Sequence, residues 1–135
     1  EIHTIKGTRI LLVEDNELNA EIAKTVLEDD GALVTRVEDG QQAVELFKEK
    51  PTGTFDAILM DLMMPVMDGY TATKKIRSLE RSDAKPIPII AMTANAFQED
   101  AEKCIAVGMN VHLAKPLDIE KVMITICHLV KKKNE

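Results

Sequence analysis

The sequence predicts an α/β fold in which helices cover both faces of a parallel sheet. Short apolar runs alternate five times along the chain with segments of helical period, and several of these runs are too uniformly apolar to have a solvent-facing side. With 135 residues, of which 45% are hydrophobic and 30% charged, the chain suits one continuous core and leaves no room for a second domain.

The five expected strands are the apolar runs themselves, at residues 9–13, 33–37, 57–60, 87–92 and 110–113. Between them, apolar residues recur at the spacing of a helix, and we expect each such stripe to face the sheet. The stripes are Leu18, Ile22 and Val26; Phe97, Ala101 and Ile105; and Ile119, Val122, Met123 and Ile126.

Charge and hydropathy argue against several classes of function. The net charge of −6 disfavours nucleic acid as a partner, because phosphate backbones are bound chiefly through Lys and Arg. No apolar run approaches the roughly 20 residues that a bilayer crossing needs, so no direct membrane contact is expected. Without an export signal we expect a cytoplasmic domain, whose parent protein is free to be membrane-anchored. Residues 1–8 are polar and aperiodic, which predicts a linker or an N-terminal tail ahead of a domain at residues 9–133.

Polar residues follow four of the five expected strands, each at the point where the apolar run ends. In a doubly wound parallel sheet the carboxyl ends of the strands meet at one edge, where loops converge at the reversal of strand order. Any one of these residues alone has an ordinary structural explanation, since acids and threonines cap helices and fill turns. The placement of all of them at one edge of the sheet predicts a site. These residues are Glu14, Asp15, Asp61, Thr93, Ala94, Lys115 and Pro116.

The residue types point to phosphoryl transfer assisted by a divalent ion. Carboxylates brought close together repel, and a hard cation such as Mg²⁺ (or Mn²⁺) relieves the repulsion. Two acids, the backbone carbonyl of Met63 and a phosphoryl oxygen would serve as its ligands. A carboxylate is also a competent phosphoryl acceptor, and Lys115 would neutralise charge on the transferred group. The Thr93 hydroxyl would donate to another phosphoryl oxygen, while Ala94 leaves room for the group.

Four segments, VEDNELNA, ILMDLMMPVMDGYTA, IIAMTANA and HLAKPLD, resemble the receiver domain of two-component response regulators. The match covers nearly the whole chain. The resemblance implies that Asp61 is the phosphoacceptor and that Glu14 and Asp15 are the acidic metal pair. It further implies that Thr93 is the switch hydroxyl and Lys115 the phosphate-binding lysine.

The same resemblance implies a fold. It is the flavodoxin-like doubly wound five-stranded parallel sheet of order 2-1-3-4-5, with five helices. The Lys115–Pro116 peptide bond is implied to be cis, a geometry that would aim the lysine inward.

The run from Glu14 to Asn16, with Asn19 three residues later, and the segments MPVMDG and MTANA are similar to receivers of hybrid sensor histidine kinases. Such receivers accept phosphate from a kinase histidine and often pass it to a histidine phosphotransfer domain, docking through the first helix. Leu18, Asn19 and Ile22 are therefore docking candidates, although the period favours packing of Ile22 on the sheet. The resemblance implies that the domain catalyses only its own phosphorylation and dephosphorylation, whereas a parent hybrid protein would be a histidine kinase. A weak homodimer of this domain is compatible with the resemblance.

Other positions depart from the commonest receiver pattern or tune it. Glu14 stands where many relatives have aspartate, and its extra methylene favours metal contact through water, with Asp15 as the direct ligand. His112 replaces the Tyr or Phe that relatives carry three residues before the lysine, which makes it the switch candidate. The resemblance implies that Met63 and Asn95 flank the approach of water to the phosphoryl group. We expect slow self-hydrolysis, because Met63 offers no hydrogen bond to orient a water and Asn95 supplies no strong base.

Two functions of other classes would use some of the same residues. A phosphohydrolase related to the haloacid dehalogenases also forms an aspartyl-phosphate, but that family carries a second aspartate two positions after the nucleophile, where this chain has Met63. A degenerate receiver would serve only as a protein-binding scaffold, which the filled pocket positions disfavour. A phosphodonor with Mg²⁺ separates the three, giving an adduct, turnover of a substrate, or no reaction.

Overall fold

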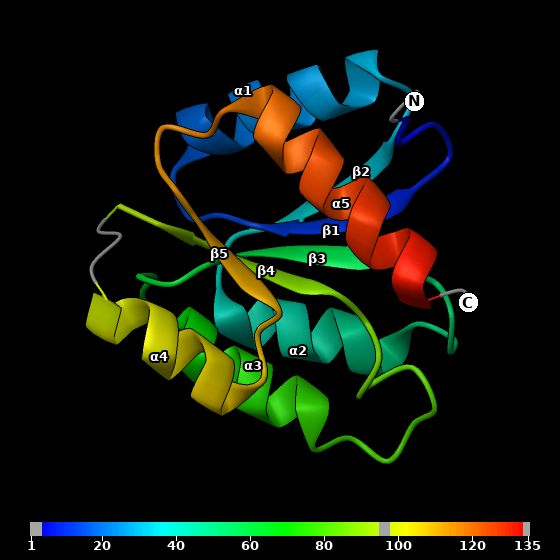
Figure 1. Ribbon diagram of the computed structural model, residues 1–135. Helices are drawn as coiled ribbons and strands as arrows, with labels where there is room; N and C mark the ends of the chain where they lie inside the picture. The colour runs from blue at the N-terminus through cyan, green and yellow to red at the C-terminus, as the bar shows by residue number, and fades with distance from the viewer. Residues whose placement is uncertain (1–3, 95–97, 134–135) are drawn as a thin grey trace.

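The computed structural model describes residues 4–94 and 98–133, and in this part of the chain five strands alternate with five helices. In chain order they are β1 Arg9–Val13, α1 Glu17–Asp29, β2 Leu33–Val37, α2 Gly40–Glu49, β3 Ala57–Asp61, α3 Gly69–Arg77, β4 Ile89–Thr93, α4 Gln98–Val107, β5 Val111–Ala114 and α5 Ile119–Lys133. The strands form one parallel sheet in the order β2-β1-β3-β4-β5. Helices α1 and α5 cover one face, and α2, α3 and α4 cover the other (Figure 1). The predicted fold and strand order are confirmed.

Three of the five strands have boundaries that differ from those predicted, and among these differences β4 ends one residue later, at Thr93, and β5 begins one residue later, at Val111. β4 begins two residues late, at Ile89, because Ile87 donates its N–H into a turn and Pro88 has no N–H to donate. β3 and β5 run one residue further than predicted, to Asp61 and Ala114, because both residues still pair with β4. The shift matters for the site, since it makes Asp61 the last residue of its strand.

Side chains of β1 alternate between two cores. Ile10 and Leu12 pack with α1 and α5, whereas Leu11 and Val13 pack with α2, α3 and α4, as the period of a strand requires. All four side chains are fully buried. The sheet therefore has no solvent-facing side at its centre, as its uniformly apolar runs predicted.

The predicted sheet-facing stripe of α1 is wrong. Leu18 is 65% exposed and Ile22 is 56% exposed, whereas Ala20 and Leu27 are buried and Ala23 packs partly against the core. Residues 20, 23 and 27 also have helical spacing, and the small alanines let the helix lie close to the sheet. The larger apolar residues are left on the solvent side, so the preference for packing Ile22 on the sheet is overturned.

The remaining stripes give a mixed result. On α4, Ile105 is 61% exposed while the neighbouring Cys104 is buried, so Ile105 does not face the sheet. Phe97 lies outside the described residues. On α5 the prediction is confirmed, because Val122 and Ile126 are buried in the core shared with α1.

The segment before β1 packs against the domain. Ile5 is fully buried in the core shared by α1 and α5. Leu33 donates its N–H to the Thr8 carbonyl at 2.9 Å, and Cys127 Sγ of α5 lies 3.0 Å from the carbonyl oxygen of Thr4. The packed part of the chain thus includes residues of the stretch expected to be a linker or tail.

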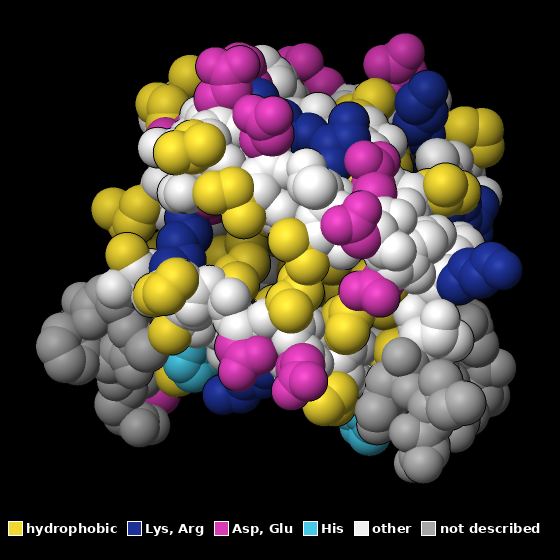
Figure 2. Space-filling view, turned by 90° about the horizontal axis from the view of Figure 1, so that it is seen from above, with side chains coloured by type: hydrophobic (Ala, Val, Ile, Leu, Met, Phe, Trp, Pro, Cys, Tyr) yellow, Lys and Arg dark blue, Asp and Glu magenta, His cyan; other side chains and the backbone are white. Residues whose placement is uncertain are grey.

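The face covered by α1 and α5 carries an apolar groove. Figure 2 looks onto this face and shows hydrophobic side chains gathered between the two helices. A hollow of about 450 Å³ lies there, lined by side chains that include Ile22, Val26, Leu117 and Ile119, and by Glu14 and Lys115 of the acidic cluster described below. Among the described residues, no helix has both the length and the apolar character needed to cross a membrane.

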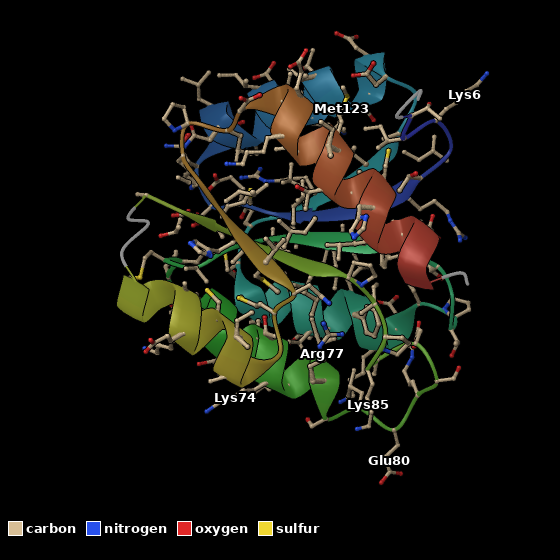
Figure 3. All side chains as sticks on the ribbon, in the orientation of Figure 1. Lys6, Lys74, Arg77, Glu80, Lys85 and Met123 are labelled. Carbon is tan, nitrogen blue, oxygen red and sulfur yellow. The ribbon has the colours of Figure 1, made fainter. Side chains whose placement is uncertain are left out.

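At the amino-terminal edge of the sheet, one arginine joins three segments. Arg77, at the end of α3, donates to the carbonyl of Gly108 at 2.9 Å and to that of Ile87 at 2.7 Å. It also donates to the carbonyls of Ala84 and Lys85 and to Asn110 Oδ1. In Figure 3, Arg77 lies within the fold, whereas Lys74 and Glu80 point outward at the rim. These hydrogen bonds tie the end of α3 to the segments that precede β4 and β5.

Candidate functional site

The carboxyl-terminal edge of the sheet brings the predicted polar residues together. Glu14 directly follows β1, Asp61 ends the adjacent β3, Thr93 ends β4 and Lys115 directly follows β5. Strand order reverses between β1 and β3, since β2 lies on one side of β1 and the later strands lie on the other. The cluster therefore sits at the topological switch point of the sheet, where ligands of such folds bind.

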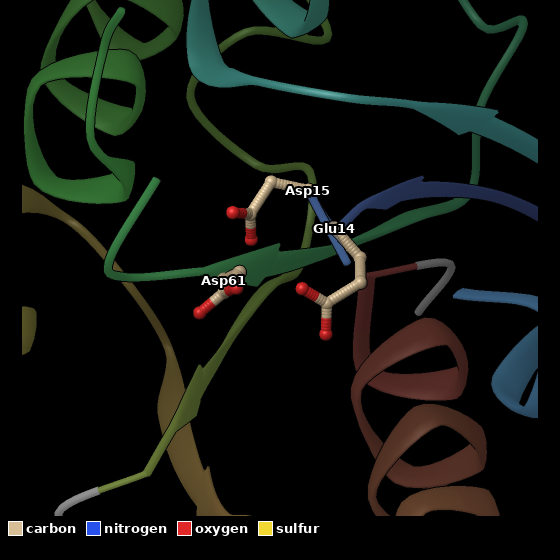
Figure 4. Close-up of side chains that lie close together, drawn as sticks. All are labelled: Glu14, Asp15 and Asp61. Atoms are coloured by element: carbon tan, nitrogen blue, oxygen red, sulfur yellow. The ribbon is translucent and has the colours of Figure 1, made fainter. Parts of the chain in front are cut away.

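Three carboxylates converge at this point. Glu14, Asp15 and Asp61 each offer an oxygen, and the three oxygens lie within 4.8 Å of one another (Figure 4). Glu14 and Asp61 are only 3% and 4% exposed, whereas Asp15 is exposed. A set of hard oxygen donors at this spacing fits a divalent cation of the Mg²⁺ class, with an open side for water or another ligand.

Lys115 bridges the two buried acids. Its Nζ donates to Glu14 Oε1 at 2.9 Å and to Asp61 Oδ2 at 3.1 Å. Burial, followed by the hydrogen bond and negative charge of Glu14, raises the pKa of Asp61 to about 7 although Lys115 opposes the shift. For Glu14, burial works to raise the pKa, but hydrogen bonds to Asp61 and Lys115 outweigh it and lower the pKa. One lysine thus does not fully compensate two buried acids, and a cation would relieve the conflict.

The loop after Asp61 directs the Met63 N–H toward the site and exposes the side chains of Met63 and Val66, whereas Met64 and Met67 pack against the core. The N–H of Met63 lies 3.4 Å from Asp61 Oδ1, and the Met63 side chain is 75% exposed. Val66 has a positive φ of 66° and is 81% exposed. Gly69 packs on the Asp61 backbone so closely that a Cβ would meet its carbonyl oxygen at 2.3 Å, which excludes other residues there. Sequence reasoning missed this glycine, although the MDG segment signals a tight turn.

The other predicted residues occupy diverse environments. Thr93 is buried at the end of β4, and Ala94 beside it is exposed. His112 is half-buried on β5, paired in register with Ala91. The Lys115–Pro116 peptide bond is cis, the geometry that the resemblance implies. Asn95 lies outside the described residues.

The first helix starts at the same edge. Asn16 caps α1, accepting the N–H of Asn19 at 2.9 Å, and this cap follows Asp15 directly. Leu18, Asn19 and Ile22 are all exposed on α1, so the docking candidates share the solvent-facing side of a helix that begins at the acidic cluster.

Residues 10–126 match the family model of the response regulator receiver domain. The chain belongs to this family. Its receiver fold is shared with the receiver domain of a sensor histidine kinase from Pseudomonas aeruginosa PAO1, a structure with a magnesium ion coordinated in the active-site cleft. The TM-score is 0.83 at 43% sequence identity, over 93% of this chain and 98% of that chain.

A second solved relative comes from the co-crystal structure of the Saccharomyces cerevisiae histidine phosphotransfer signalling protein with the receiver domain of its downstream response regulator. It matches with a TM-score of 0.85 at 30% identity, over 98% of this chain and 94% of that chain.

The curated relatives of this receiver include much longer proteins. Histidine kinase 1 of Arabidopsis thaliana is 39% identical over 95% of the chain, and hybrid signal transduction histidine kinase B of Dictyostelium discoideum is 41% identical over 94% of it. The chain spans 13% and 7% of the lengths of these two proteins.

Proposed function

We propose that this receiver accepts a phosphoryl group from a histidine kinase onto Asp61 and relays it to a histidine phosphotransfer partner. The observation that carries the proposal is the environment of Asp61. It is a buried carboxylate at the end of β3, within 4.8 Å of oxygens of Glu14 and Asp15 and 3.1 Å from Lys115 Nζ.

The proposed transfer is a nucleophilic displacement at phosphorus. An Asp61 oxygen attacks the phosphorus of a phosphohistidine, the new O–P bond forms, and the P–N bond breaks with its electron pair left on the imidazole. Mg²⁺, or Mn²⁺ in its place, would be held by Glu14, Asp15, Asp61 and the Met63 carbonyl and would supply positive charge at the phosphoryl oxygens. Glu14 would act through water, because its side chain is one methylene longer than the aspartate of many relatives and its Oε1 already accepts from Lys115.

Two residues would then hold the transferred group, and a third would leave room for it. Lys115, already in contact with Asp61 Oδ2, would donate to one phosphoryl oxygen. Thr93 would donate its hydroxyl to another, and Ala94 adds no bulk beside it. His112 stays a candidate for the side chain that moves inward when Thr93 shifts, which comparison of its ring resonances with and without a phosphoryl mimic would test.

Asp61→Asn tests the acceptor, because it keeps the shape and removes the nucleophilic oxygen. Incubation with acetyl phosphate and Mg²⁺, followed by intact-mass measurement, should show one phosphoryl group on the wild type and none on the variant. Asp68→Asn is the matched control, since asparagine still caps α3 as Asp68 does through the Thr71 N–H. Phosphorylation of Asp61→Asn at the wild-type rate would contradict the assignment, and turnover of a substrate would favour the phosphohydrolase.

The proposed partners would dock beside the acidic cluster on α1. Leu18 and Ile22 expose large apolar side chains there, next to Asn19 and the groove shared with α5. An apolar patch beside a charged site suits a helical partner that must bring a histidine to Asp61. The named relatives support a parent hybrid histidine kinase. We propose that this receiver, at residues 9–133 with Ile5 added to its core, lies in the cytoplasm, and that the parent is free to be membrane-anchored.

Leu18→Asp tests the docking face. With the phosphorylated S. cerevisiae histidine phosphotransfer protein as donor, transfer to the variant should fall about tenfold, the effect of losing an interface anchor worth roughly 1.4 kcal/mol. Phosphorylation by acetyl phosphate should not change. Ile105→Asp on α4 is the matched control, because Ile105 is 61% exposed and lies on the opposite face of the sheet. Equal transfer by both variants would move the docking site away from α1.

The lifetime of the phosphoryl group is the remaining part of the proposal. The exposed Met63 side chain offers no hydrogen bond to orient a water for hydrolysis, and Asn95 supplies no strong base. A slowly hydrolysed adduct suits a relay that waits for its partner. Met63→Asn should therefore lose the phosphoryl group faster than the wild type, and an unchanged decay rate would rule out shielding by Met63.

A further inference from the structure

We propose that Arg36 is a positioning residue for the cation, because it fixes the backbone of the turn that carries Glu14 and Asp15. The inference rests on the metal site proposed above. It concerns a residue that lies on the neighbouring strand β2 and does not itself offer a ligand atom.

The contacts of Arg36 are made to the main chain of the acidic turn. Its Nε and Nη2 donate to the Glu14 carbonyl at 3.0 and 2.8 Å, and Nη2 also lies 3.4 Å from the Asp15 carbonyl. The guanidinium is planar and rigid, so two donors on one oxygen fix the direction of that peptide group. Of the three acids expected to bind the cation, Glu14 and Asp15 therefore have their backbone carbonyls contacted by one side chain.

The sheet itself supports the turn only up to its first residue. β1 pairs with β2 as far as Val13, and the Glu14 N–H extends the ladder to the Val37 carbonyl at 3.2 Å. Beyond that point the chain leaves the sheet and enters α1 through its Asn16 cap. The Arg36 contacts fall in this gap between strand and helix, where Asp15 and its exposed carboxylate lie.

The role of Arg36 is not explained by a surface ion pair. Its nearest acid is Glu38 at 3.8 Å, and the Glu38 side chain is 66% exposed, a geometry that contributes little to stability. The Arg36 side chain is only 21% exposed, and its shorter hydrogen bonds are donated to a backbone carbonyl oxygen, that of Glu14. It is also the single charged residue in the strand sequence LVTRV.

Positioning and charge predict opposite effects on cation affinity. A guanidinium near the cluster repels a divalent cation, so loss of the charge alone would tighten binding. Loss of the hydrogen bonds frees the turn, and removal of a residue that orients ligands typically weakens metal binding about 10- to 100-fold. The sign of the change in affinity therefore separates the two roles.

The experiment is an NMR titration of the metal-free protein with Mg²⁺, comparing wild type with Arg36→Met and Arg36→Lys. We expect the dissociation constant to rise about tenfold in Arg36→Met and by a smaller factor in Arg36→Lys, which keeps the charge but not the fork. Arg9→Met is the matched control, because it removes an arginine that pairs with Asp56 at the other end of β1. Its affinity should equal that of the wild type.

Phosphorylation by acetyl phosphate across a range of Mg²⁺ concentrations gives a second readout. The Mg²⁺ concentration for half-maximal rate should rise in Arg36→Met, while the rate at saturating Mg²⁺ stays within about twofold of wild type, as expected for an effect on affinity alone. Tighter or unchanged binding in Arg36→Met overturns the inference, as does a lower saturating rate.

Two controls keep the result interpretable. If Arg36→Met does not fold, Arg36→Lys decides, and wild-type affinity in that variant overturns the inference. If the wild type does not bind Mg²⁺, or if Asp15→Ala binds it equally well, the metal site itself is wrong. If both controls behave and only the Arg36 variants match wild type, Arg36 alone has been misassigned.

Discussion

The two edges of the sheet differ in how their polar side chains are paired. At the amino-terminal edge, Arg77 donates to four carbonyls and to the Asn110 side chain, and Arg81 binds both Asp83 and the Phe47 carbonyl. At the carboxyl-terminal edge, Glu14 and Asp61 compete for Lys115. Hydrogen bonds stabilise the first edge, whereas the second keeps an excess of negative charge that a cation would compensate. Stability and function are thus separated along the strands.

The largest expected effect is the loss of Arg77. Burial lowers the pKa of its guanidinium to about 10, so it stays charged at neutral pH while it bonds to carbonyl oxygens. Arg77→Met would leave several of those oxygens without a donor, and we expect the free energy of unfolding to fall by about 3–5 kcal/mol in urea denaturation. Lys75→Met, an exposed change on the same helix, should cost less than about 0.5 kcal/mol.

The comparison of the edges would fail if Arg77→Met lost under about 1 kcal/mol, the size of a single ordinary hydrogen bond. It would also fail if the Mg²⁺ affinity of the remaining folded protein changed, because Arg77 lies at the edge away from the acidic cluster. The second measurement matters more, since it tests whether the two edges are energetically separate.

The next effect is a pH dependence that arises at the carboxyl-terminal edge. The folded protein keeps a proton on Asp61 up to about pH 7, whereas the unfolded chain loses it near 3.8. Between these values the folded state binds more protons, so this stabilisation is complete at low pH and is lost as pH rises through 7. Asp61→Asn lacks this titration because an amide does not ionise. It is a suitable reference because the amide resembles the protonated acid in shape and charge.

In metal-free buffer, we expect the unfolding free energy of Asp61→Asn relative to wild type to increase by on the order of 2 kcal/mol between about pH 5 and pH 8. Thermal or urea melts at several pH values measure it, and Asp68→Asn should show no such trend. A difference between Asp61→Asn and wild type that is flat with pH would mean that Asp61 is ionised in the folded protein and that the charge conflict is absent.

The sequence predicted the functional edge better than the stabilising one. Glu14, Asp61 and Lys115 follow apolar runs in the chain, and parallel topology alone brings such positions together, so their meeting was foreseeable. The strand order itself came from the resemblance, because periodicity along one chain does not say which strands pair.

The features that the sequence did not predict are set by tertiary contacts. Arg77 and Arg36 bond to carbonyl groups 7 to 31 and 21 to 22 residues away, respectively, and carbonyls leave no mark in a sequence. The stripe error on α1 has a related cause, since Leu18 and Ile22 outweigh small alanines in any hydrophobic pattern. A large apolar residue in a regular stripe can serve a partner as well as a core, and the pattern does not distinguish them.

The smallest effect concerns a buried polar group that belongs to neither edge. Thr73 lies in the middle of α3 and is fully buried, and among the described residues its Oγ1 is the buried side-chain oxygen without a hydrogen-bond partner. Thr73→Val keeps the branched shape and removes the unpaired hydroxyl, so we expect a gain of about 1 kcal/mol in unfolding free energy. Thr71→Val, an exposed change on the same helix, should gain nothing.

Because Thr73 lies outside the acidic cluster, the Mg²⁺ affinity and the phosphorylation rate of Thr73→Val should match wild type. A loss of stability would instead show that the hydroxyl has a partner, and altered phosphorylation would show that α3 is coupled to the carboxyl-terminal edge.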